Sequence, residues 1–101
     1  MNTKKEFQKT ISSIRKDWRE KRNTPRAEYP KAMMTSQQMD NGTATVNCGG
    51  DFCSFSKELA EYVMNDRRFQ KFLADADANA AIEMFYHYSC PAYQVRIRFQ
   101  K

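Results

Sequence analysis

The chain has 101 residues, of which 41% are hydrophobic and 29% are charged. This length suits one domain with one modest core, and we expect residues 1–101 to fold as a single unit. The aliphatic and aromatic content can support a core, which excludes a disordered chain. The longest near-apolar stretch, around residues 80–86, is far too short to span a bilayer, so we expect no membrane partner.

The cysteine count and the N-terminal segment indicate the compartment. The chain has three cysteines, and an odd number cannot form a fully paired disulfide framework. The polar start, Met1-Asn2-Thr3-Lys4-Lys5, is not followed by the apolar run of a secretory signal. Both features predict a protein of the reducing cytoplasm.

The net charge of +5 is unevenly distributed along the chain. Residues 1–31 carry ten Lys or Arg against four Asp or Glu, which is +6, whereas residues 32–101 carry seven against eight, which is −1. All the excess basicity therefore belongs to the first segment. Such asymmetry favours a phosphate backbone, an acidic protein face or an anionic surface as the partner.

The first predicted element is a basic helix over residues 1–22. Thr3 and Glu6 match a T-x-x-E capping box, which satisfies backbone N–H groups at a helix start. Four apolar residues then recur at spacings of four, three and four, on one face of a helix: Phe7, Ile11, Ile14 and Trp18. Pro25 disfavours a helical conformation at Thr24, so the helix should end near Arg22.

A linker and a hairpin are predicted next. Residues 23–31 contain two prolines and lead into a β-β-α-β-β portion, residues 32–101. Asn41-Gly42 is typical of a two-residue turn with positive φ. Closing a hairpin there sets the pairs Met39–Ala44, Gln37–Val46 and Thr35–Cys48.

The following segment is predicted as one helix with a kink at Asn65-Asp66, although Asp66 could instead cap a second short helix. Ser54 or Ser56 can cap its start. Its buried stripe comprises Leu59, Tyr62, Val63, Phe69, Phe72 and Leu73. Residues 74–79 are expected to end this helix.

The last quarter alternates apolar and polar residues with a period of two, which predicts two strands. Folding them about a loop at residues 89–92 sets Tyr86–Val95, Met84–Ile97 and Ile82–Phe99 on one face, and Glu83–Arg98 and Phe85–Arg96 on the other. The fold class is therefore α+β. We expect the order α-β-β-α-β-β, with an antiparallel or mixed four-stranded sheet packed against two main helices.

The basic helix is the first candidate contact surface. Its cations could neutralise phosphates or meet acidic side chains, and the candidate residues are Lys5, Lys9, Arg15, Lys16, Arg19 and Arg22. The alternative is the ordinary solvated face of an amphipathic helix, which Glu6, Asp17 and Glu20 partly balance.

The outward face of the last hairpin is the second candidate surface. Phe85, Arg96 and Arg98 would form an aromatic and basic patch of the kind that RNA-binding sheets expose. The alternative is that the N-terminal helix, or a second copy of the chain, covers Phe85. A homodimer through an unpaired strand edge is a further alternative.

Metal binding and catalysis are disfavoured. Cys48, Cys53, His87 and Cys90 supply four ligand types that suit zinc, but their spacing is poor for a structural site, so we expect neither a metal nor another cofactor. The chain has one histidine and no Gly-rich phosphate loop. We therefore expect no enzymatic activity.

These features predict a small non-enzymatic binding protein that occludes or regulates a macromolecular partner through its basic helix and sheet surface. Inhibitors and adaptors encoded by phages or mobile elements often have this character, by analogy alone. The expected partner is a protein or a protein–nucleic acid complex. The alternative is a nucleic-acid-binding domain that uses the basic helix and the Phe85/Arg96/Arg98 face.

Overall fold

A computed structural model of the chain describes residues 3–22, 30–33, 42–48, 55–87 and 90–100. Its helices are α1 (Thr3–Arg22), α3 (Ser56–Asn65) and α4 (Arg67–Asp75). Its strands are β1 (Lys31–Met33), β2 (Thr43–Asn47), β3 (Ala78–His87) and β4 (Cys90–Phe99). The chain is thus of the α+β class, as predicted.

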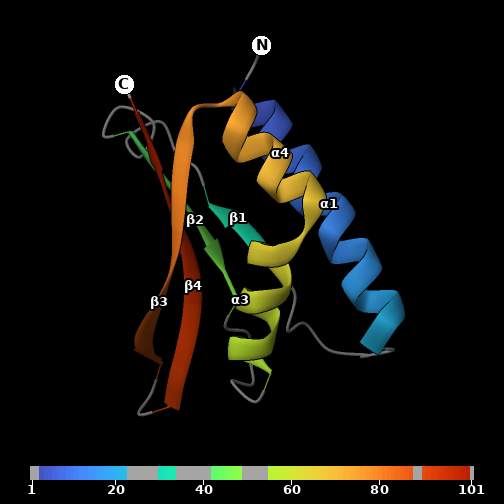
Figure 1. The fold of residues 1–101 in the computed structure, drawn as a ribbon. Coiled ribbons are helices and arrows are strands. Elements are labelled where there is room, and N and C mark those ends of the chain that lie inside the picture. Colours follow the sequence, from blue (N-terminus) through green and yellow to red (C-terminus); the bar gives the residue numbers. More distant parts are fainter. Residues whose placement is uncertain (1–2, 23–29, 34–41, 49–54, 88–89, 101) are drawn as a thin grey trace.

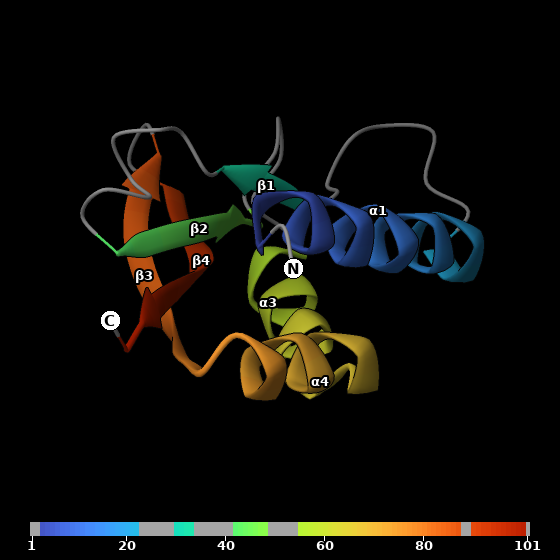
Figure 2. The ribbon, with the colours of Figure 1, turned by 90° about the horizontal axis from the view of Figure 1, so that it is seen from above.

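The molecule has two layers, with the described helices on one face of the sheet (Figures 1 and 2). The strand order is β1-β2-β4-β3, and each of the described neighbouring pairs is antiparallel. Three longer strands, β2, β4 and β3, make up most of the sheet, and β1 adds three residues at the edge of β2. Among the described residues, no helix lies on the outer face of the sheet.

The first predicted hairpin is wrong in its register. Val46 lies between Ala32 of β1 and Val95 of β4, which leaves no place opposite it for Gln37. The predicted strand around residues 35–39 lies outside the described residues, so a four-stranded sheet built from it stays a prediction. Gly42 has φ +71°, as the turn signal predicted, and its carbonyl accepts a hydrogen bond from the Phe99 N–H at 2.8 Å.

The end of the predicted linker is also part of the folded structure. Pro30 is fully buried, and Lys31 belongs to β1. Residues 23–29 lie outside the described residues.

The predicted hairpin of β3 and β4 exists, but its register is displaced by four residues. Ile82 lies opposite Val95 and Met84 opposite Tyr93, and His87 pairs with Cys90 at the end of the ladder. A four-residue shift preserves which face each side chain occupies, because strand side chains alternate with a period of two. The alternating pattern therefore predicted the faces correctly and the partners wrongly.

The end of α4 sets this register. The Gln100 N–H donates to the Asp77 carbonyl at 3.1 Å, immediately before β3 begins at Ala78. The small side chains of Ala78 and Ala80 then lie opposite the larger Phe99 and Ile97. Alanine at these positions leaves room for the helices that pack on this end of the sheet.

The predicted single kinked helix is two helices. Asp66 has an extended conformation (φ −72°, ψ 133°) and interrupts the helical path between α3 and α4. Its side chain accepts a hydrogen bond from the Arg68 N–H at 2.8 Å, which makes it the N-cap of α4. The alternative of a second, Asp66-capped helix is therefore confirmed.

Ser56 does not cap α3. The residue preceding the helix is Phe55, which makes no side-chain capping hydrogen bond. Ser56 is instead buried, and its Oγ accepts a hydrogen bond from the Tyr93 N–H of β4 at 2.7 Å. The serine thus joins the start of α3 to the sheet.

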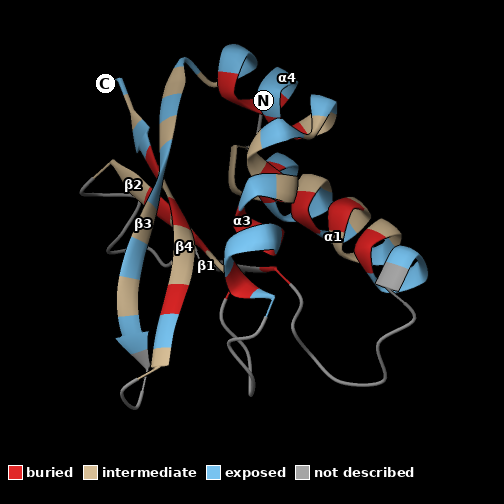
Figure 3. Cartoon of the chain, turned by 60° about the horizontal axis from the view of Figure 1, so that its bottom comes forward, coloured by how far each residue is buried: buried red, intermediate tan, exposed pale blue. Residues whose placement is uncertain are grey.

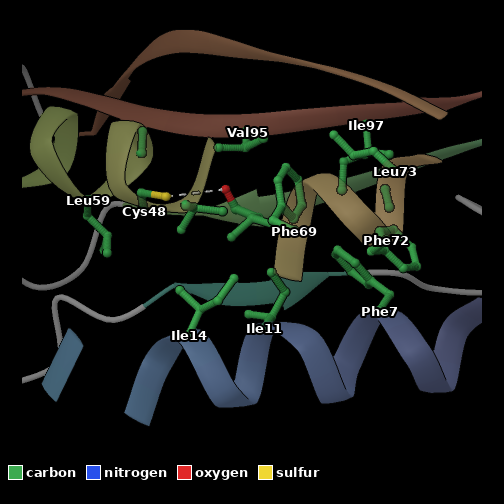
Figure 4. Packing of buried hydrophobic residues seen from close by; sticks show 14 of the residues in the cluster. Phe7, Ile11, Ile14, Cys48, Leu59, Phe69, Phe72, Leu73, Val95 and Ile97 are labelled. Atoms are coloured by element: carbon green, nitrogen blue, oxygen red, sulfur yellow. Dashed lines mark hydrogen bonds between the residues drawn. The ribbon is translucent and has the colours of Figure 1, made fainter. Parts of the chain in front are cut away.

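The core lies between the helical layer and the sheet (Figure 3). Figure 4 shows Phe7, Ile11 and Ile14 projecting from α1 toward the other layer. The ring centroids of Phe7 and Phe72 are 5.6 Å apart, so α1 packs directly on α4. The apolar stripe predicted for the second helical segment is also buried, except that Tyr62 is half-buried.

Candidate binding surface on the basic helix

The outward face of α1 carries a row of basic side chains. Four basic residues and Ser12 between them recur at spacings of four, three, four and three, and all five are exposed. We call this row the basic stripe: Lys5, Lys9, Ser12, Lys16 and Arg19. At 1.5 Å per residue the row is about 21 Å long. The sequence predicted four of its members, and the helical period explains why they share one face.

The basic stripe lies directly opposite the apolar stripe that anchors α1. Phe7, Ile11, Ile14 and Trp18 are each at most 1% exposed. Phe7 packs on Phe72 of α4 and Trp18 packs on Tyr62 of α3, so both ends of the helix are anchored in the core. The basic stripe is therefore presented by a fixed element of the fold.

Arg15, which was also predicted as a contact residue, does not lie in this row. Its Nε and Nη2 donate to the Pro30 carbonyl at 3.0 and 2.8 Å. The guanidinium thus ties α1 to the residue that precedes β1. The side chain of Arg22, the remaining predicted cation, lies outside the described residues.

Three acidic residues of α1, Glu6, Asp17 and Glu20, partly balance its basic residues. Asp17 forms an ion pair with Arg68 of α4 at 2.7 Å, and Glu6 lines a groove shared with Lys71 of α4. Glu20 is exposed four residues after Lys16, and Glu6 is exposed three residues before Lys9, so these two acids lie beside the four cations of the stripe. The local field over the stripe therefore remains positive.

Arg68 lies between two carboxylates and fastens α1 to α4. Its guanidinium contacts Asp17 at 2.7 Å and Asp66 at 2.8 Å. Burial pushes the pKa of Asp66 upward, but the hydrogen bonds and charge of Arg68 outweigh this and hold it below its ordinary value. The side-chain hydrogen bond with Asp66, together with Asp17, raises the pKa of Arg68 despite its partial burial.

A cleft of about 430 Å³ lies at the end of α1, bordered by α3 and the start of α4. The rings of Trp18 and Tyr62 are 5.1 Å apart on its wall, and Lys21 Nζ lies 5.1 Å from the Tyr62 ring centroid. Desolvation, followed by the charges of Asp17 and Asp66, raises the pKa of Tyr62. The sequence did not predict this cleft, because the stripe pattern assigns both aromatic residues to the core.

The second candidate surface, the outer face of the last hairpin, differs from its prediction. Arg96 Nε donates to Glu83 Oε1 at 3.0 Å, so Arg96 is the ion-pair partner predicted to be Arg98. Phe85 is half-buried and lies opposite Ala92, where Arg96 had been expected. Arg98 is exposed. The carboxylate of Glu83 therefore partly neutralises this patch.

The structure separates the two candidate surfaces. Arg96 and Arg98 alternate with the buried Val95 and Ile97, so they lie on the outer face of the sheet. Helix α1 lies in the layer on the other face (Figure 2). It therefore does not cover Phe85, and one flat partner surface cannot contact both sets.

The cysteines do not form a described metal site. Cys48 is buried, its Sγ lies 3.7 Å from the Val46 carbonyl, and desolvation raises its thiol pKa to about 12. Cys90 is partly exposed at the start of β4. Cys53 and the side chain of His87 lie outside the described residues. Among the described residues, no group of three His, Cys, Asp or Glu side chains is placed to hold a metal ion.

The acidic residues that end α4 have structural contacts. Asp75 accepts from Lys71 Nζ at 2.8 Å, and that hydrogen bond raises the pKa of the lysine. Asp77 has φ +52° at the entry to β3.

No helix in the described part of the chain combines the length and apolar character needed to cross a bilayer.

Comparisons with protein-family models, with curated proteins and with solved structures find no match for this chain.

Proposed function

We propose that this chain is a non-enzymatic binding protein that docks on an acidic surface of a protein partner through the basic stripe of α1. The observation that carries the proposal is the position of the stripe, which is exposed and lies opposite a fully buried anchor. A partner contact there requires no unfolding of the helix. Occlusion of an acidic site on the partner, as by an inhibitor or adaptor, is the mechanism that this geometry favours.

Charge complementarity supports the proposal. Matching potentials accelerate association and exclude partners of the wrong sign. The stripe is rigid, so its four cations lose little backbone entropy when they meet carboxylates. The outer sheet face offers two cations, Arg96 and Arg98, against the four of the basic stripe, and Glu83 pairs with Arg96, so this face is the weaker candidate.

Capture from a nuclease-treated host lysate tests the proposal with three charge reversals in the stripe, Lys9→Glu, Lys16→Glu and Arg19→Glu. The control reverses Lys57, Arg67 and Lys71, which are exposed on α3 and α4 and give the same change in net charge. We expect the wild type and the control to retain one partner protein that the stripe variant loses. Equal capture by both variants would contradict the proposal.

A second candidate function is binding of nucleic acid by the same stripe. Its support is the straight row of about 21 Å, which suits successive phosphates. If four cations each neutralise one phosphate, the slope of log K against log salt on duplex DNA should approach about −3.6. Fluorescence anisotropy with a mixed-sequence duplex and a single-stranded RNA measures it, and no binding at low salt removes this candidate.

A further inference from the structure

The outer edge of β3, on the side away from β4, is a long edge of the sheet. Strand β3 has ten residues and ends the strand order β1-β2-β4-β3. Within the described residues no strand pairs with this edge. It contains no proline and one charged residue, Glu83, whereas the opposite edge is β1 with three residues and a lysine. Long edges without such protection pair readily with another strand.

The hydrogen-bond pattern shows which backbone groups point outward. In β4, the Phe99 N–H donates to Gly42 and the Tyr93 carbonyl accepts from Cys48, so the odd-numbered residues of β4 face β2. Its even-numbered residues consequently face β3, and their register partners in β3 are odd-numbered. The even-numbered residues of β3, among them Ile82, Met84 and Tyr86, therefore direct their N–H and C=O groups to the free edge.

The same three residues expose apolar side chains. Ile82 is 37% exposed, Met84 is 52% and Tyr86 is 70%, and they lie on the helical face of the sheet. The helices cover the other end of β3, where Ala78 and Ala80 lie opposite Phe99 and Ile97. The uncovered end thus combines free backbone groups with an apolar row.

We propose that a second copy of the chain pairs with this edge, β3 to β3, antiparallel about a twofold axis at Met84. In this register Met84 lies opposite Met84 of the second copy, and each Ile82 lies opposite a Tyr86. Antiparallel pairing joins residues whose N–H and C=O both point to the seam, which these residues provide. The apolar pairs are of the favoured aromatic and β-branched kind.

Symmetry and charge favour a second copy as the occupant. Twofold antiparallel pairing of two β3 strands places each exposed apolar residue of one copy opposite an exposed apolar residue of the other, so no partner of different sequence is needed. Displacing the register by one step toward the start of β3 would set Glu83 against Glu83, which is unfavourable, so charge selects against that alternative. The basic α1 lies beside β1, at the edge away from β3 (Figures 1 and 2), so pairing here keeps the two basic helices far apart.

Sedimentation velocity over about 1 to 300 µM protein tests the proposal, because a single strand seam is a small interface and dissociates on dilution. We expect the wild type to shift from monomer to dimer over this range. Met84→Lys should remain monomeric, because it places two cations at the twofold axis. Ala81→Lys adds the same charge on the outer face of β3 and should dimerise like the wild type.

A wild type that is monomeric throughout would overturn the proposal, as would dimers in Met84→Lys. Met84→Pro is a second test, because it removes an N–H that faces the free edge and leaves the β4 ladder intact. We expect it to fold, as judged by near-UV circular dichroism, and to remain monomeric.

Disulfide trapping tests the register. Directly opposed residues of a hydrogen-bonded antiparallel pair have Cα atoms about 5.5 Å apart, within the range of a disulfide. Met84→Cys should therefore form a covalent dimer on mild oxidation. Ile82→Cys has the same native cysteines but lies opposite Tyr86, and it should not exceed the wild-type background. Equal trapping of both variants would overturn the register.

Discussion

At the scale of single residues, Ser56 shows how one buried hydroxyl connects the two layers. Strand β2 ends at Asn47, and the Cys48 N–H makes the last contact with the Tyr93 carbonyl. The Tyr93 N–H donates instead to Ser56 Oγ at 2.7 Å. A partly buried N–H needs an acceptor within the protein, and the serine provides it from α3.

Ser56→Ala should therefore lower the free energy of unfolding by about 1 kcal/mol, because it removes the acceptor of the partly buried Tyr93 N–H. Chemical denaturation with a fluorescence readout measures the change. Ser13→Ala is the matched control, because Ser13 is not buried and its Oγ donates to the Lys9 carbonyl within the same helix. An equal, small effect of both substitutions would show that the Ser56 bond contributes little.

At the scale of elements, the N-cap of α4 depends on one carboxylate. Asp66 accepts hydrogen bonds from the Arg68 N–H at 2.8 Å and from the Arg68 guanidinium at 2.8 and 3.0 Å. Its negative charge also lies at the positive end of the helix dipole. Since Arg68 reaches Asp17 as well, this cap contributes to the contact between α1 and α4.

Asp66→Ala should cost about 1 kcal/mol of folding free energy, whereas Asp66→Asn keeps the cap and should cost less. The pKa of Asp66 is lower in the folded than in the unfolded chain. The charged carboxylate therefore stabilises the fold at pH values above the pKa of an unfolded aspartate, about 3.9. This contribution disappears as the pH falls through the lower pKa that Asp66 has in the folded chain. Denaturation of wild type and Asp66→Asn between pH 7 and pH 2 should show the two converging, and a pH-independent difference would contradict this.

The elements themselves were largely predictable, because amphipathic periods identify helices and strands without tertiary information. The partners of those elements were not. The register of β3 depends on Asp77 reaching Gln100 and on the small side chains of Ala78 and Ala80 beneath the helices. Alternation with a period of two fits equally well after a shift of four residues, so the sequence pattern cannot select among such registers.

For the candidate binding surfaces, too, the sequence predicted which side chains are exposed but not which residues they contact. The exposure of Lys9 and Lys16 follows from the helical period of the apolar stripe alone. The contacts of Arg15 with the Pro30 carbonyl and of Arg96 with Glu83 required the fold, because they join residues from different elements or depend on the register. The pairing edge of β3 likewise appears only once the helices are placed over its first residues.

At the scale of the whole molecule, α1 is part of the core and not a detachable arm. Its buried residues contact α4 through Phe7 and Phe72, and Trp18 packs on Tyr62 of α3. The basic stripe and the apolar stripe therefore occupy one helix with opposite roles. Changes to the outward face should affect binding, whereas changes to the inward face should affect folding.

Residues 30–101 alone should consequently lack a cooperative unfolding transition, because removal of α1 takes away the side chains that pack on Phe72 and Tyr62. Trp18→Ala in the full chain should cost about 3 to 5 kcal/mol, whereas Lys9→Glu should change stability by less than about 0.5 kcal/mol. Calorimetry and near-UV circular dichroism measure both effects. A native-like, cooperative transition in the truncated chain would instead mean that α1 can leave the domain, and the basic stripe would then be presented by a mobile helix.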